Sequence, residues 1–341
     1  MEGPAQRQPV RQRHPPQPSR GGRPLAAGDP GDPGPPAARG PRAPGPATAP
    51  LRHLAGDGRP PGLPLGVEAA VDRVADYVFL RELGRGEGSQ VYLARTPRRL
   101  GIAADTVAVK VQPLTGDDGF GALADELGLV AALRSPRLVP LYDVGTDVAS
   151  VFYAMRHEAL GSLAAPTRDL TRRERLLAVA RAARGAHEMH EAGLVHRGIG
   201  ATNILLDKDG AVLAEPAVGH LLTRGHTHSG LGTGARAGRL ELVDPELMRG
   251  RPAGRASDIW ALGVTLHLAL TGHGLFPALV SADAFTAVRI YLRSHPEPGE
   301  DLSDGERAVV VTALHPDPAR RYRTADDFAE AVEEVARRHG G

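Results

Sequence analysis

The sequence predicts an α+β protein with two lobes, a small β-rich lobe with one helix followed by a larger helical lobe. Most strand-like segments lie between residues 77 and 155, and helical periodicity dominates from residue 171 onward. Strands first and helices afterwards are typical of segregated α+β domains. A change of composition near residue 66 sets an N-terminal arm apart from both lobes.

The arm is rich in proline, glycine and arginine. Residues 1–66 hold 17 of the 30 prolines and no Phe, Trp or Tyr. Such a stretch buries too little apolar surface to offset the entropy of ordering, so we expect disorder over residues 1–70. Its nine arginines against four acids give about +5, whereas the remainder, with 32 basic and 36 acidic residues, carries about −4. A solvated tail is one interpretation; nucleic acid, an acidic membrane surface and an SH3-like partner are alternatives without a clear motif.

Composition excludes several classes of function. The chain has no cysteine, which excludes disulfides, thiolate metal sites and thiol catalysis. The N-terminus lacks the apolar core of a secretory signal. The longest apolar run, Ile259 to Leu270, has 12 residues and is too short for a membrane span. We therefore expect a soluble, cytoplasmic protein.

Alternating and β-branched residues predict the strands of the first lobe. Residues 77–80 and 91–94 flank a glycine cluster, which indicates two strands joined by a tight loop. Three further strands are expected at 107–111, 138–144 and 151–155. Leu123, Leu127 and Val130 recur at helical spacing and predict a helix over 119–134.

Capping boxes and apolar stripes predict the helices of the second lobe. Thr171 and Glu174 form a capping box that opens a helix ending at Gly193. Residues 257–271 are apolar on all faces and predict a buried helix. Thr324 opens a last helix, over which Phe328, Val332 and Val335 share one face.

The most informative pattern is H-R-G-I-G-A-T-N at residues 196–203. Compared with H-R-D-L-K-P-x-N it retains His196, Arg197 and Asn203, but glycine replaces the Asp and the Lys. The glycine cluster, G-R-G-E-G-S-Q-V at residues 84–91, matches G-x-G-x-x-G-x-V except for Ser89 at the third glycine, and V-A-V-K follows at 107–110. Lys110 is one of only two lysines in a chain with 39 arginines, which indicates a specific need for a compact ammonium.

These motifs resemble those of the Ser/Thr protein kinase family, bacterial eukaryotic-like type, over about residues 72–337. D-P-E at 244–246 resembles A-P-E, residues 257–263 resemble S-D-x-W-S-x-G, and residues 317–321 resemble D-P-x-x-R. The resemblance implies a kinase-like fold with an N-lobe over 72–156 and a C-lobe over 157–337. It also implies ATP as ligand, with Mg²⁺ or Mn²⁺ less securely, and protein partners such as kinases or regulated enzymes.

The resemblance assigns roles to individual positions. Glu126, or Asp125 in its place, should pair with Lys110, and Met155 should lie behind the adenine. Asn203 and Glu215 correspond to the metal ligands. His196, Arg197, Glu246, Asp258 and Arg321 correspond to structural positions: Glu246 should pair with Arg321, and Asp258 should brace the backbone of the loop. The residues implied to contact nucleotide are Gly84, Arg85, Gly86, Glu87, Gly88, Ser89, Val91, Ala108, Lys110, Glu126, Met155, His157 and Leu205.

The chemical positions depart from the family pattern together. Gly198 offers no proton acceptor and Gly200 no cation for the transferring phosphoryl group. Glu-Pro-Ala at 215–217 stands in place of D-F-G, and Arg239 in place of a threonine that would bridge the missing Asp and Lys. A matched loss favours a catalytically impaired, pseudokinase-like scaffold or regulator that still binds ATP.

Other interpretations remain open at this point. One is an active or slow Ser/Thr kinase, or another nucleotide transferase, because phosphoryl transfer depends mostly on positioning and charge. Another is an interaction module that binds no nucleotide. Between residues 217 and 244, Thr227, Ser229 and Thr233 are candidate phosphorylation sites, with Arg197 as the partner of the phosphate. His226 and His228 in the same segment are a weak candidate for a metal site, and the alternative is the ordinary polarity of an exposed loop.

Overall fold

A computed structural model describes residues 73–86, 88–113, 119–147, 150–215, 237–279 and 282–339. All of them belong to one compact unit, Leu65–Gly341. The predicted arm over 1–70 lies outside the described residues, as do Glu87, Pro216, Ala217, His226, Thr227, His228, Ser229, Thr233 and the side chain of Arg239.

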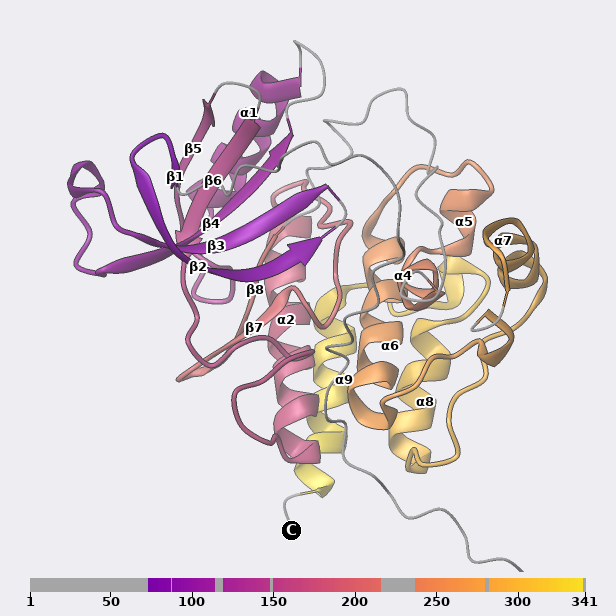
Figure 1. Ribbon diagram of the computed structural model, residues 1–341. Coiled ribbons are helices and arrows are strands. Elements are labelled where there is room, and N and C mark those ends of the chain that lie inside the picture. Colours follow the sequence, from indigo (N-terminus) through magenta and orange to yellow (C-terminus); the bar gives the residue numbers. More distant parts are fainter. Residues whose placement is uncertain are drawn as a thin grey trace, which may run out of the picture. The chain divides into compact units, whose positions relative to one another are not determined.

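The first lobe is a six-stranded antiparallel sheet in the order β1-β2-β3-β4-β6-β5, accompanied by α1 (Figure 1). Alternate residues of its central strands face two different apolar clusters. Ala108 and Met155 enter one cluster, and Val109 and Ala154 enter the other. The period of two in the sequence thus reflects a sheet buried on both faces. The elements are β1 (Arg73–Val74), β2 (Tyr77–Gly86), β3 (Ser89–Arg95), η1 (Arg98–Leu100), β4 (Thr106–Pro113), α1 (Gly119–Ala132), β5 (Leu141–Asp147) and β6 (Ser150–Arg156).

Helix α1 forms where the periodicity predicts it, with Leu123, Leu127 and Val130 buried. The strand expected from residue 138 begins only at Leu141. Residues before it pair elsewhere: the Val139 N–H donates to the Leu213 carbonyl at 2.9 Å, and the Leu213 N–H donates to the Arg137 carbonyl at 2.8 Å. Pro140 has no N–H to continue a ladder, so β5 starts after it.

The described residues of the second lobe form helices and one hairpin. The capping box at Thr171 forms as predicted, with the Glu174 N–H donating to the threonine side chain, and Thr324 caps the last helix in the same way. The hairpin of β7 and β8 is absent from the sequence-based expectation. The elements are α2 (Arg172–Glu191), β7 (Ile204–Asp207), β8 (Gly210–Leu213), α4 (Ala237–Leu242), α5 (Pro245–Met248), α6 (Arg255–Thr271), η2 (Pro277–Leu279), α7 (Ala284–Arg293), α8 (Asp304–Ala313), η3 (Pro318–Arg320) and α9 (Ala325–Arg338).

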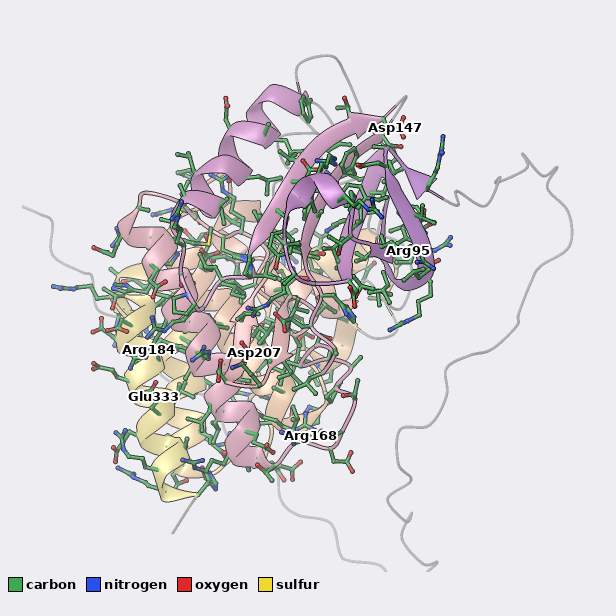
Figure 2. The ribbon with its side chains drawn as sticks, turned by 90° about the vertical axis from the view of Figure 1, so that its left-hand side faces the viewer. Arg95, Asp147, Arg168, Arg184, Asp207 and Glu333 are labelled. Carbon is green, nitrogen blue, oxygen red and sulfur yellow. The ribbon has the colours of Figure 1, made fainter. Side chains whose placement is uncertain are left out.

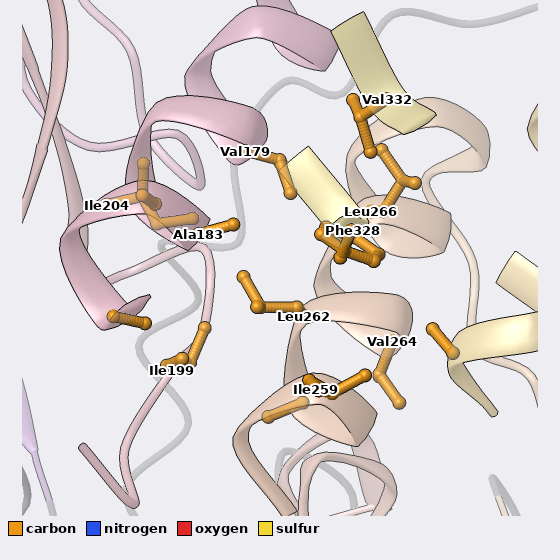
Figure 3. Close-up of a cluster of buried hydrophobic side chains, with 14 of the residues drawn as sticks. Val179, Ala183, Ile199, Ile204, Ile259, Leu262, Val264, Leu266, Phe328 and Val332 are labelled. Atoms are coloured by element: carbon orange, nitrogen blue, oxygen red, sulfur yellow. The ribbon is translucent and has the colours of Figure 1, made fainter. Parts of the chain in front are cut away.

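Helix α6 is the centre of the helical core. Figure 3 shows Leu262 and Leu266 of this helix beside Phe328 of α9 and Val179 of α2, and all four belong to one buried cluster. At the periphery α2 and α9 are also joined by Arg184 and Glu333, whose Nη2 and Oε2 atoms lie 3.0 Å apart (Figure 2). This core supports the loop that follows α2, where the informative motif lies.

Leu262→Ala should lower the free energy of unfolding by about 2–5 kcal/mol, because Leu262 is fully buried and its truncation leaves a cavity. The matched control is Leu129→Ala on α1, where the side chain is 57% exposed and we expect a change within about 0.5 kcal/mol. Urea unfolding of the full chain measures both. Equal costs for the two variants would contradict the assignment of α6 to the core.

The unfolding free energy should also depend on His267 of α6, a buried residue whose Nε2 accepts the Gly299 N–H at 2.9 Å. Burial, helped by the neighbouring charge of His273, lowers the pKa of His267 from 6.5 to about 4. The folded state therefore favours the neutral ring, while the unfolded chain takes up a proton below about pH 6.5. This contribution is complete above pH 6.5 and is lost as the pH falls towards 4.

The loss should reach about 3 kcal/mol at most. Urea unfolding of the wild type and of His267→Gln, measured from pH 7.5 to pH 4, should give a difference that shrinks with falling pH. A difference independent of pH would show that His267 is not held neutral.

Candidate active site

The glycine cluster forms the tight turn between β2 and β3. Gly84 pairs with Val91, Arg85 with Gln90, and Gly86 with Ser89 across the hairpin. Gly88 adopts a φ of +67°, a backbone conformation that side chains disfavour, which explains a glycine at this position. Glycines at 84, 86 and 88 leave the backbone of this hairpin open to the close approach that phosphate binding requires.

An apolar wall lies behind this turn. Ala108 and Met155 are 4% and 3% exposed and lie opposite each other on β4 and β6. Val91, Leu83 and Leu205 pack against the same cluster from the two lobes. The structure thus brings together the predicted adenine-contacting residues, and their contact with a base remains a prediction.

The connection after β6 is tied to the helical lobe by charge. Arg156 forms ion pairs with the Glu158 carboxylate and, at 3.5 Å, with Asp207 of β7. Burial, together with the charge of Arg81, lowers the pKa of His157 between them. The expected nucleotide contact His157 therefore lies at a half-buried connection with a neutral ring favoured. We keep the division of the lobes at 156/157 as a proposal.

The predicted pair of Lys110 with Glu126 is wrong. The Lys110 Nζ lies 2.6 Å from Oε2 of Glu215, and both side chains are 17% exposed. Glu126 of α1 instead lies 3.8 Å from Nη1 of Arg197. The physical reason is reach. Glu215 has one methylene more than an aspartate and a φ of +57°, and its carboxylate lies beside the ammonium of Lys110. The alternative partner, Asp125, is not bonded to Lys110 either within the described residues.

The loop after α2 is held by one buried carboxylate. Asp258 of α6 accepts the backbone N–H groups of His196 and Arg197, each at 2.8 Å, which confirms the predicted brace. Its Oδ2 also lies 2.8 Å from Nε2 of His190. Arg197 adopts a φ of +61°, so the brace holds an unfavourable backbone conformation.

Two further contacts hold this loop, one with the residue before Glu215 and one within the loop itself. His196 is 1% exposed, burial lowers its pKa, and its Nε2 lies 3.1 Å from the Ala214 carbonyl. Asn203 donates its amide N–H to the Gly198 carbonyl at 2.7 Å. The loop therefore keeps a defined geometry although glycine occupies both chemical positions.

An apolar side chain lies close to Gly200. A Cβ atom built on Gly200 would lie 3.2 Å from Cδ1 of Leu242, tighter than an ordinary contact. Leu242 ends α4 and packs on the helical core. A side chain at residue 200 would therefore require Leu242 to shift by a few tenths of an ångström.

That segment is anchored by Glu241, a residue that the sequence-based interpretation missed. The Glu241 carboxylate accepts the N–H groups of Leu275 and Phe276 at 2.9 and 3.3 Å, and burial raises its pKa. Its backbone carbonyl accepts Nε1–H of Trp260 at 2.8 Å. One signal was present: Glu241 is the only charge in the apolar run Leu240–Val243.

The predicted pair of Glu246 with Arg321 is wrong as well. Arg321 is fully buried and bonds both oxygens of Asp244, at 2.5 and 3.1 Å. Glu246 pairs with Arg249 and Arg251 at 2.7 and 2.8 Å. Asp244 is 3% exposed, so it is the carboxylate inside the core where the guanidinium needs a partner.

Asp244→Asn should destabilise the protein by about 3–5 kcal/mol, because it leaves a buried guanidinium without a counter-charge. The asparagine keeps one oxygen, for the Glu246 N–H that Asp244 caps, and turns an amide N–H₂ group towards the guanidinium, so the change removes both the counter-charge and one acceptor of Arg321. Glu246→Gln is the matched control and should cost about 1 kcal/mol or less, since its arginine partners are exposed. Thermal and urea unfolding should separate the two; a larger cost for Glu246→Gln would restore the original pairing.

The donors at the predicted metal position do not form a set for a divalent cation. Magnesium is usually bound through one or two carboxylates together with phosphates. Here the Glu215 carboxylate is bonded to Lys110, and the Asn203 amide oxygen accepts the Thr202 hydroxyl at 3.3 Å. No cluster of three His, Cys, Asp or Glu side chains suitable for a metal occurs in the described residues.

A separate hollow of about 470 Å³ lies on the helical lobe, between α2, α9 and the β7–β8 hairpin. Arg168, Arg184, Asp207 and Glu333, labelled in Figure 2, contribute to its wall. Arg168 is paired with Glu174, and Arg184 with Glu333, so much of the charge around the hollow is balanced locally.

Across the described residues, no helix has the length and apolar character needed to cross a bilayer.

Comparisons with known proteins show which family this chain is similar to. A family model described as "Protein kinase domain" matches residues 77–333. The chain is 30% identical over 288 residues to the tyrosine-protein kinase MasK of Myxococcus xanthus, an alignment that covers 77% of this chain. It is 29% identical over 282 residues to the serine/threonine-protein kinase PknJ and 26% identical over 269 residues to PknA, both of Mycobacterium tuberculosis, with 78% and 76% of this chain covered. The chain spans only 43%, 46% and 61% of the lengths of these three relatives.

Proposed function

We propose that this chain, which belongs to the protein kinase family of the bacterial eukaryotic-like Ser/Thr type, is a pseudokinase. It binds ATP between its lobes, does not transfer the phosphoryl group to a protein hydroxyl, and acts on protein partners in the cytoplasm as a scaffold or regulator.

One observation carries the proposal, the packing of Leu242 at Gly200 beside Gly198. Neither glycine offers a proton acceptor or a cation, and the space of the missing lysine is reduced by an apolar side chain. Loss of the base alone is typically worth about 10²–10⁴ in rate. Loss of the cation removes further stabilisation of the charge that develops in transfer.

The nucleotide side of the site supports retained binding. The glycine turn, the apolar wall of Ala108 and Met155, and Lys110 all lie around one position. The groups suited to hold a nucleotide are thus together, while those suited to activate a hydroxyl are replaced. Binding without transfer is the function that this division favours.

The second candidate is a slow kinase. Asn203 keeps its place on the loop, and Glu215 still supplies a carboxylate, so a weak transfer by positioning alone is chemically feasible. The named relatives do not agree on the acceptor, since one is a tyrosine kinase and two are serine/threonine kinases by name. The third candidate, a module without nucleotide, is favoured only by the neutralisation of Lys110 by Glu215.

The full chain should show a rise in melting temperature with ATP and no transfer of label from γ-labelled ATP in Mg²⁺ or Mn²⁺. A ligand at 100 times its Kd adds about 2.7 kcal/mol of stability, enough for a shift of several degrees. Lys110→Ala should abolish the shift. Lys208→Ala is the matched control, because the only other lysine is 89% exposed at its side chain, and it should leave the shift intact.

Autophosphorylation that disappears in Lys110→Ala would show that the protein is a slow kinase rather than a pseudokinase. The absence of a shift with any nucleotide would leave the interaction module.

A further inference from the structure

We infer that a nucleotide binds here without a divalent cation, and that Glu215 acts as an internal competitor of its phosphates rather than as a metal ligand. The inference rests on the proposed nucleotide binding and deepens it. It concerns four charged groups at the junction of the lobes: Lys110, Glu126, Arg197 and Glu215.

These four groups are paired crosswise. Lys110 of the sheet bonds Glu215, which follows β8, at 2.6 Å, and Glu126 of α1 lies 3.8 Å from Arg197. Each positive group therefore already has a carboxylate close to it. The shorter contact is in the range of a charge-assisted hydrogen bond, the stronger class of such bonds.

Phosphate and Glu215 require the same ammonium. Lys110 is 17% exposed, and the carboxylate of Glu215 covers it from the other lobe. A phosphate oxygen that bonds Lys110 must displace that carboxylate or share the ammonium with it. Sharing would place two negative groups side by side in a partly buried site, which raises the cost.

Glu215 would have to share its carboxylate between Lys110 and a cation, because its Oε2 already bonds the ammonium. Its backbone has a φ of +57°, and Ala214 before it is held by His196. Asn203, the other predicted ligand, donates its amide N–H to the loop and accepts the Thr202 hydroxyl with its oxygen. The donor set therefore offers a metal one amide oxygen and one carboxylate that is already bonded.

Substitution of Glu215 separates the two roles by the sign of its effect. As a competitor, Glu215 weakens nucleotide binding, so Glu215→Gln should tighten it. As a metal ligand, Glu215 would strengthen the binding of the metal complex, so the same change would weaken it. The two readouts are opposite and need no catalytic activity.

The experiment is calorimetric titration of the full chain with ATP, once in EDTA and once in excess Mg²⁺. We expect the wild type to bind in EDTA with an affinity no weaker than in Mg²⁺. Glu215→Gln should bind ATP about tenfold more tightly in EDTA, since a bond to a charged group is removed from competition. The matched control is Glu188→Gln, which breaks the ion pair of Glu188 with Arg137, a pair that includes none of the four charged groups, and should not change affinity.

The outcomes are distinguishable. Binding that requires Mg²⁺, or weaker binding by Glu215→Gln in Mg²⁺, overturns the competitor role and leaves nucleotide binding intact. Absence of heat and of any melting shift with ATP, in both buffers and both proteins, overturns the proposed nucleotide binding itself. The comparison of the two buffers uses the wild type alone, so it decides the metal question even where Glu215→Gln fails to fold.

Discussion

A buried carboxylate on α6 holds the whole site in place. Asp258 accepts the N–H groups of His196 and Arg197 and contacts His190, so the loop after α2 is fixed to a helix that lies largely in the core. From there the contacts continue through His196 to the Ala214 carbonyl, and the next residue reaches Lys110 in the sheet. The position of the ammonium is thus coupled to the helical core through one chain of hydrogen bonds. An unsatisfied group in that chain would be costly, because most of it is buried.

The two errors in ion pairing have a common physical cause. In each case the sequence identified the cation, Lys110 or Arg321, and assigned it the wrong carboxylate. A motif specifies residue types at a spacing, but competition between nearby acids is decided by reach and burial. Asp244 and Glu246 lie two residues apart, and only the first enters the core. Glu215 gains its contact from a longer stem, which the sequence shows, and from a left-handed backbone, which it does not show.

Elements with strong local signals were predictable, and those defined by tertiary contacts were not. Three helices are predicted by patterns that span only a few residues: the capping boxes at Thr171 and Thr324, and the apolar stripe of Leu123 and Leu127. The hairpin of β7 and β8 has strands of four residues, too short for periodicity to reveal. The start of β5 depended on pairing with Leu213, about 70 residues away along the chain. At the site, the apolar wall was predictable from the resemblance, whereas Glu241 required knowledge of which N–H groups surround it.

The close approach of Leu242 to Gly200 bears on reversibility. Replacing Gly198 by aspartate would supply a base, but a side chain at residue 200 would begin 3.2 Å from Leu242, whose neighbours Glu241 and Val243 are held by hydrogen bonds from Leu275, Trp260 and Tyr291. A side chain at residue 200 would therefore require Leu242 to shift by a few tenths of an ångström. Restoring the family's catalytic loop thus involves the packing of α4 as well as residues 198 and 200.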